Sequence, residues 1–133
     1  MRLPSPLAAR IVRSIESQLP PGSTVQYMPP HLLLVGIPPE DSQRGPRREW
    51  GVQLGVRRRH GITPQSTARA VKDALDELNT YLSRKTTPNW ATPMTPPLVA
   101  DAIVAGDVIQ ATITDSAGQR IIFPAIPLEE DHP

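Results

Sequence analysis

The sequence predicts an α+β protein, with one mostly antiparallel sheet of about five strands and two main helices packed on it. Two segments, 7–19 and 68–82, carry apolar residues at helical spacing. Strand-like runs come in blocks between and after these segments, which is typical of α+β proteins and not of βαβ repeats. Most of the 17 prolines lie between the periodic segments, where they stiffen loops. The predicted order is α-β-β-β-α-(short α)-β-β.

The first helix is predicted to begin at Ser5-Pro6. Serine is a good N-cap residue, and proline is tolerated at the first helical position. Pro20-Pro21-Gly22 ends the segment. One apolar stripe is formed by Leu7, Ile11, Val12, Ile15 and Leu19.

Two strands are predicted next, at 24–28 and 31–37. The run from Leu32 to Val35 is apolar without alternation. Strands of this kind are usually covered on both faces, so we expect a layer on each side of this one.

A third strand is predicted at 49–58, after a turn-rich loop at 38–48 that we expect to be exposed. Its large apolar residues, from Trp50 onward, alternate on one face. Gly51 and Gly55 leave the other face nearly bare, which permits close approach of another backbone.

The second helix has the clearest pattern. Thr63-Pro64 repeats the cap-plus-proline start. Arg69 and Asp73 stand one turn apart on the polar face, at a spacing that favours an ion pair. The apolar stripe consists of Ala68, Val71, Leu75, Leu78 and Leu82.

The last third is more irregular. The segment 98–105 fits a short helix or a strand, and we expect the short helix. Residues 107–114 and 119–126 then form a hairpin across the turn at 115–118. One domain is expected over 1–126, followed by an acidic, flexible tail at 127–133.

The residues that carry most enzyme chemistry are missing or scattered. The chain has no cysteine, and its three histidines, His31, His60 and His132, stand far apart in the sequence. No GxSxG or GxxxxGK[ST] motif occurs. We therefore expect no enzyme activity, no cofactor and no metal site.

Six arginines are the best candidates for an interaction role, although the net charge is only +1. They form two separated basic groups, each able to contact phosphates or the carboxylates of a partner. The alternative is that they only solubilise turns. The candidates are Arg44, Arg47, Arg48, Arg57, Arg58 and Arg59.

Trp90 and Met94 lie in the proline-rich loop and allow two interpretations. A loop tryptophan is often an interface anchor, which would make this loop a docking segment. Equally, both side chains could pack onto the core of their own domain.

Over residues 5–82 the chain resembles the tail-terminator, or tail-completion, proteins of long-tailed bacteriophages. The resemblance rests on the helix ending in LPPGSTVQY, the strand pair around the loop with Arg44 and Arg47-Arg48, the strand GVQLGVRRR and the helix TPQSTARAVKDALDEL. Members are small α+β subunits that form a ring at the end of the tail tube and contact head-connector proteins. The resemblance implies a homo-oligomer with other assembly proteins as partners, located in the cytoplasm or in the virion.

Two alternatives stay open. A protein-binding chaperone or regulatory module would dock its partner through Trp90 and Met94, and the element order is also similar to secretion-chaperone-like folds. Nucleic-acid binding would use the arginines. No apolar segment approaches the roughly 20 residues that a membrane helix needs.

Overall fold

The computed structural model describes residues 3–37, 48–56, 59, 61–83, 90 and 94–128. In this part of the chain the α+β class is confirmed, with two helices and seven strands. The elements are α1 (Ser5–Glu16), β1 (Thr24–Met28), β2 (Leu32–Ile37), β3 (Arg48–Gln53), α2 (Pro64–Ser83), β4 (Val99–Ala105), β5 (Val108–Thr114), β6 (Arg120–Ile122) and β7 (Ile126–Pro127).

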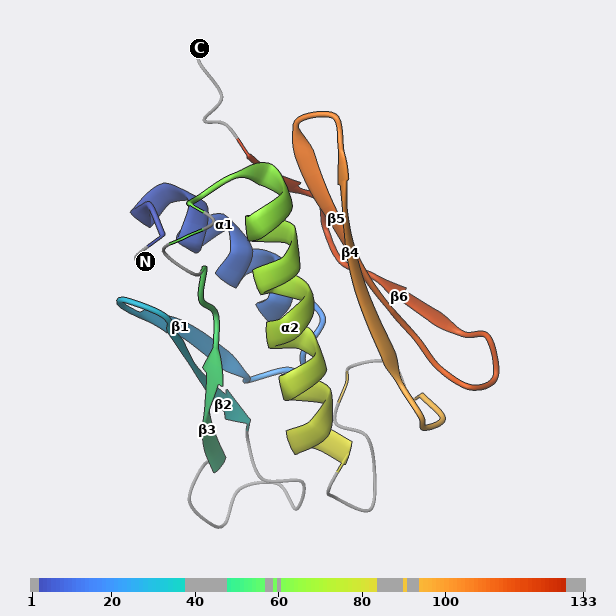
Figure 1. The fold of residues 1–133 in the computed structure, drawn as a ribbon. Coiled ribbons are helices and arrows are strands. Elements are labelled where there is room, and N and C mark those ends of the chain that lie inside the picture. Colours follow the sequence, from blue (N-terminus) through green and yellow to red (C-terminus); the bar gives the residue numbers. More distant parts are fainter. Residues whose placement is uncertain are drawn as a thin grey trace.

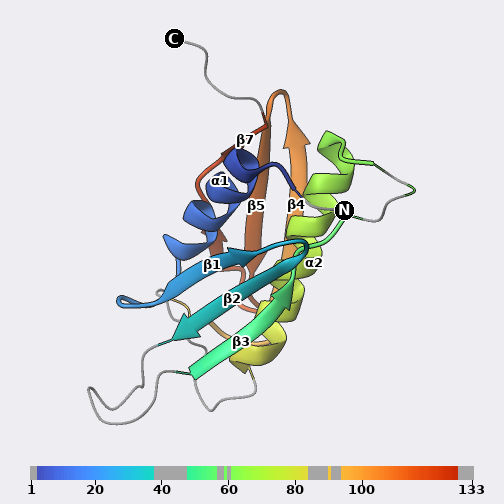
Figure 2. The same ribbon diagram turned by 90° about the vertical axis from the view of Figure 1, so that its left-hand side faces the viewer.

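The strands form two antiparallel sheets with the helices between them (Figures 1 and 2). Sheet A has the order β1-β2-β3. Sheet B has the order β4-β5-β6, and β7 pairs with β5 as well. The single sheet expected from the sequence is thus wrong in this detail, because α2 lies between the two groups of strands and contacts β3 in one and β4 and β5 in the other.

Alternation along each strand turns one face of each sheet toward the helices. In sheet A, Val25 faces Val35 across the ladder, and Val35 faces Trp50. Val25 and Val35 are buried, whereas Trp50 is half-buried and stacks on Tyr81 of α2, with ring centroids 6.1 Å apart. In sheet B the inward residues include Ala100, Ile109, Ala111, Ile113 and Ile121.

Helix α1 connects the two sheets. Its N-cap is Pro4 without a side-chain hydrogen bond, so the predicted capping role of Ser5 is wrong. The Ser14 hydroxyl donates to the Pro124 carbonyl (2.5 Å), and Arg10 Nε donates to the Pro127 carbonyl (2.7 Å). These bonds hold β7 and the residues just before it against α1.

The first two residues of the predicted tail belong to the fold. Pro127 belongs to β7, and the Leu128 amide donates to the Asp107 carbonyl (2.8 Å). The rest of that tail, 129–133, lies outside the described residues.

Helix α2 begins as expected, with a reciprocal cap. The Ser66 amide donates to Thr63 Oγ1 (3.0 Å), and the Thr63 amide donates to the Ser66 hydroxyl (2.8 Å). Burial extends beyond the predicted stripe to Thr67, Ala70 and Ala74. The second stripe is made of small residues because a sheet packs on each side of the helix.

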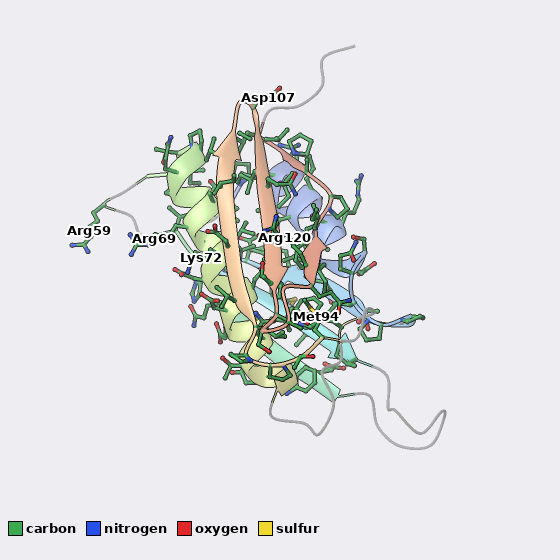
Figure 3. All side chains as sticks on the ribbon, turned by 90° about the vertical axis from the view of Figure 1, so that its right-hand side faces the viewer. Arg59, Arg69, Lys72, Met94, Asp107 and Arg120 are labelled. Atoms are coloured by element: carbon green, nitrogen blue, oxygen red, sulfur yellow. The ribbon has the colours of Figure 1, made fainter. Side chains whose placement is uncertain are left out.

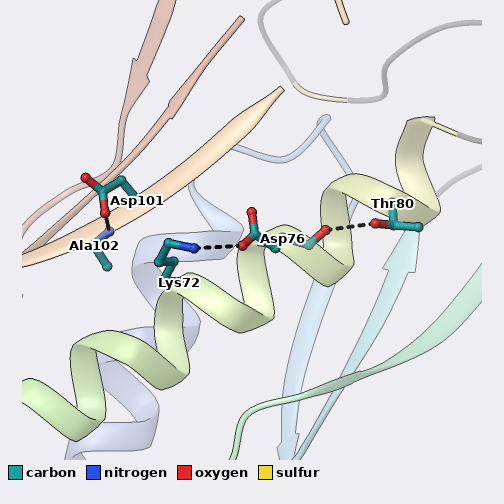
Figure 4. Close-up of polar contacts among 5 residues, drawn as sticks. All are labelled: Lys72, Asp76, Thr80, Asp101 and Ala102. Carbon is teal, nitrogen blue, oxygen red and sulfur yellow. Dashed lines mark hydrogen bonds and ion pairs between the residues drawn. The ribbon is translucent and has the colours of Figure 1, made fainter. Parts of the chain in front are cut away.

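On the polar side of α2, Lys72 pairs with Asp76 (3.1 Å), as Figure 4 shows. This is the only ion pair within the described residues, so the expected Arg69–Asp73 pair does not form there. The hydrogen bond and the charge of Asp76 raise the pKa of Lys72.

The segment expected to be a short helix is the strand β4. It pairs with β5 along its whole length, from Val99↔Thr114 to Ala105↔Val108. A two-residue turn at Gly106-Asp107 joins the strands, and Gly106 has φ +65°, a conformation that favours glycine. Cross-strand pairing with β5 therefore decides the conformation of a segment whose local sequence is ambiguous.

The turn between β5 and β6 is organised by the buried Asp115. Its carboxylate accepts hydrogen bonds from the amides of Thr95 (3.0 Å), Ala117 (3.0 Å) and Gln119 (2.7 Å). The amide of Thr95 is the main cause that lowers the pKa of Asp115, followed by those of Gln119 and Ala117. The same bonds anchor the chain just before β4.

We expect the stability of the protein to fall in acid through Asp115. Because its pKa is lower in the folded chain than in the unfolded chain, the ionised form stabilises the fold above the unfolded-state pKa, and this contribution is lost as the pH falls below about 4. Urea unfolding at pH 7 and pH 3.5 should show Asp115→Asn to be less stable than the wild type at pH 7 and less sensitive to acid. Asp73→Asn, on the exposed side of α2, is the control. Equal acid sensitivity of Asp115→Asn and wild type would contradict the assignment.

Candidate functional site: two outward sheet faces

The outer face of sheet B exposes large apolar side chains. Val99 is 63% exposed, Ile103 56% and Ile122 60%. These are three of the four exposed large hydrophobic residues among those described. We call this surface face B; it consists of Val99, Asp101, Ile103, Gln110, Thr112, Thr114, Arg120 and Ile122.

Strand pairing brings the face B residues together. Val99 and Arg120 both pair with Thr114, and Asp101 and Ile122 both pair with Thr112. The side chains line a shallow hollow of about 520 Å³, and Figure 3 views the molecule from this side, with Arg120 on the surface. Branched apolar groups beside one acid and one base suit packing against another surface.

The outer face of sheet A also carries apolar residues. Met28 is 40% exposed, and Leu32 and Leu34 are half-buried. The expectation that both faces of β2 would be covered is therefore wrong within the described residues, because only the inner face lies against the helices. We call this surface face A; it consists of Thr24, Gln26, Met28, Leu32, Leu34, Glu49, Gly51 and Gln53.

The glycines of the third strand make room for neighbours in the same chain. A Cβ atom at Gly51 would lie 3.1 Å from Leu32 Cδ1, and one at Gly55 would lie 3.3 Å from His31 Cβ. The surface around Gly51 is thus flat because Leu32 leans over it.

Carboxylate side chains accept hydrogen bonds from backbone amides of the outer strands. Glu16 of α1 accepts from the Val25 amide of β1 (2.9 Å), and Glu77 of α2 accepts from the Gln53 amide of β3 (3.0 Å). On β4, Asp101 accepts from the Ala102 amide (2.9 Å), as Figure 4 shows. Such contacts hinder strand addition at an edge, so association through the sheet faces is favoured over association through the edges.

The structure describes only part of the arginine set. Arg44, Arg47, Arg57 and Arg58 lie outside the described residues, and Arg48 is the first residue of β3. Arg59 is exposed and borders a hollow of about 280 Å³ together with Arg69, Ser66 and Asp73. Figure 3 shows Arg59 projecting well away from Arg120.

Trp90 and Met94 belong to the core. They are 3% and 5% exposed. Trp90 Nε1 donates to Asn79 Oδ1 of α2 (3.0 Å), and its ring meets Phe123 edge to face, with centroids 5.7 Å apart. The core interpretation is supported, and neither side chain is available as a surface anchor in this conformation.

Other kinds of site receive no support from the described residues. Within them, no group of three or more His, Asp or Glu side chains could hold a metal ion. No helix in the described ranges has the length and apolarity needed to cross a membrane.

The sequence contained a signal for face B that the short-helix interpretation concealed. Val99, Asp101 and Ile103 alternate with smaller apolar residues at a period of two. As a strand, this segment places Val99, Asp101 and Ile103 together on the face opposite the buried Ala100, whereas in a helix Asp101 would lie on the other side from the two apolar residues.

Comparison of the chain with protein-family models, curated proteins and solved structures finds no match.

Proposed function

We propose that this chain is a non-enzymatic assembly subunit that associates with identical copies. In this role the chain would form a ring, similar to a phage tail terminator or head-tail joining protein. The observation that carries it is face B, where Val99, Ile103 and Ile122 are each more than half exposed. Apolar surfaces grouped in this way mark interaction sites more often than isolated exposed residues do.

Two further features support assembly over catalysis. Face B offers one acid and one base among apolar and hydroxyl side chains, with neither histidine nor a pair of carboxylates. The resemblance of residues 5–82 to tail terminators supports the same class. Homo-oligomerisation is the part of this proposal that can be tested on the purified protein.

The protein-binding alternative is weakened by the burial of Trp90 and Met94. One observation supports the nucleic-acid alternative: Arg59 and Arg69 both line the 280 Å³ hollow. None of the described residues that line this hollow is aromatic, so they give no support for base stacking there.

The test is the concentration dependence of molecular mass. Light scattering coupled to gel filtration should show species larger than the monomer for the wild type at high concentration. Ile103→Lys should shift the protein toward the monomer, because a charge on face B must be desolvated on association. Ala9→Lys, at an exposed position of α1 outside both faces, should behave like the wild type. A wild type that is monomeric at every concentration would contradict the proposal.

A further inference from the structure

We infer that face B of one copy packs on face A of the next copy, so that the subunits associate head to tail. This inference rests on the proposed function and names the contact that self-assembly uses. The two faces lie on opposite sides of the molecule, separated by the helix layer (Figures 1 and 2). A contact between two different surfaces propagates from copy to copy and produces a closed ring or an open filament.

Apolar complementarity is the first argument. Face A contains the uncovered side of β2, where Leu32 and Leu34 are half-buried and Met28 is exposed. Face B contributes the protruding side chains of Ile103 and Ile122. Packing B on A would supply the second covering layer that the apolar run of β2 predicts.

Shape gives the second argument. Gly51 has no side chain, and Leu32 leans over the space above it, so this part of face A is flat. Branched side chains from the partner can approach such a surface closely. Two copies of face B would instead bring their protruding residues against each other.

Charge gives the third argument. Glu49 is the only charged residue of face A as defined by the described residues, and it is exposed. Face B carries the exposed Arg120, which pairs across the strands with Thr114, as Val99 does from the other side. Contact of B with A offers Glu49 a base, although face B also carries the acid Asp101, whereas contact of A with A offers Glu49 no base within face A.

The size of the faces predicts a weak single contact. Three strands about 4.8 Å apart and roughly 20 Å long cover on the order of 300 Å² in projection. Specific interfaces usually bury at least about 1,000 Å² in total. One contact therefore holds two copies loosely, and ring closure gives every subunit two contacts.

Mixing two variants tests the pairing of the faces. Leu34→Lys blocks face A and leaves face B intact, while Ile103→Lys does the reverse. Each variant alone should be monomeric by sedimentation velocity at concentrations at which the wild type assembles. Because a single contact is weak, their equimolar mixture should form a one-to-one dimer at high concentration and nothing larger, since only one competent B–A contact remains.

Three outcomes separate the explanations. If Leu34→Lys assembles like the wild type, face A is not used; the inference is overturned, and the proposed function stands. A mixture that stays monomeric at the highest attainable concentration also overturns the head-to-tail contact. A monomeric wild type removes the proposed function and the inference together. Near-UV circular dichroism of each variant must match that of the wild type, and Met28→Lys, at a more exposed position, replaces Leu34→Lys if the latter is unfolded.

Charge exchange provides an independent check. Glu49→Arg and Arg120→Glu should each weaken association on the order of tenfold, and the double variant should recover most of the loss. Recovery in the double variant requires the two residues to face each other across the contact. Additive losses without recovery would contradict the B–A pairing.

Discussion

Trp90→Ala is expected to lower the free energy of unfolding by about 3–5 kcal/mol, as large aromatic truncations in protein cores do. The indole is 3% exposed, meets Phe123 edge to face and donates to Asn79. Its removal would leave a cavity and an unpaired buried amide oxygen. Since small domains are stable by only about 5–15 kcal/mol, urea unfolding should show a large loss or an unfolded variant.

Trp90→Phe separates the ring from the hydrogen bond. It keeps most of the aromatic packing and removes the indole N–H, so its cost should be smaller, about 1–3 kcal/mol. An unchanged unfolding midpoint for Trp90→Ala would contradict the core assignment and return Trp90 to the docking interpretation.

Leu75→Ala is expected to cost about 2–5 kcal/mol, the range for buried leucine truncation. Leu75 is 0% exposed and lies in the middle of α2, the helix that both sheets share. The value should fall in the upper part of the range, because packing from two sides limits how far the site can collapse. Urea unfolding followed by far-UV circular dichroism measures it.

Asp73→Ala is the matched control on the same helix. Asp73 is exposed, so the change should be within about 0.5 kcal/mol. A loss for Leu75→Ala no larger than that of the control would contradict the placement of α2 between the two sheets.

Helix α2 could be predicted from the sequence because its signals are local. The stripe with Leu75 and Leu78 repeats at helical spacing, and Thr63-Pro64 marks its start. The second buried stripe, with Ala70 and Ala74, reflects the second sheet that packs on this helix. Alanine fits an exposed helix position equally well, so these residues did not allow a second buried face to be predicted from the sequence.

The strand β4 could not be assigned from local sequence, because Pro96-Pro97 and Gly106 also suit the two ends of a short helix. Its conformation follows from pairing with β5, a contact that acts through the register of the whole hairpin. The same uncertainty hid face B, since Asp101 shares a surface with Val99 and Ile103 only in a strand, and pairing through β5 is what brings Ile122 beside them.

The arginines and Trp90 show the opposite limit. They became candidates because of their residue type alone. Whether a side chain is available for binding depends on its burial, and burial is decided by how the whole core packs. Trp90 is enclosed by α2 and Phe123. The interaction surface proposed for this chain rests instead on exposed apolar residues at strand positions.

The sheet faces and edges together define how copies could meet. Backbone amides of three outer strands donate hydrogen bonds to the carboxylates of Glu16, Glu77 and Asp101. These bonds hinder the addition of a further strand at the sheet edges. The apolar outer faces carry no comparable obstruction among the described residues. Ordered assembly through faces is consistent with protection against edge-to-edge aggregation.

Native mass spectrometry of the wild-type chain, combined with electron microscopy of the same sample, shows directly whether identical copies assemble into rings. We expect one dominant species with a fixed whole number of identical subunits, seen as closed rings. A protein that stays monomeric up to the highest attainable concentration, with no rings in the micrographs, would contradict it.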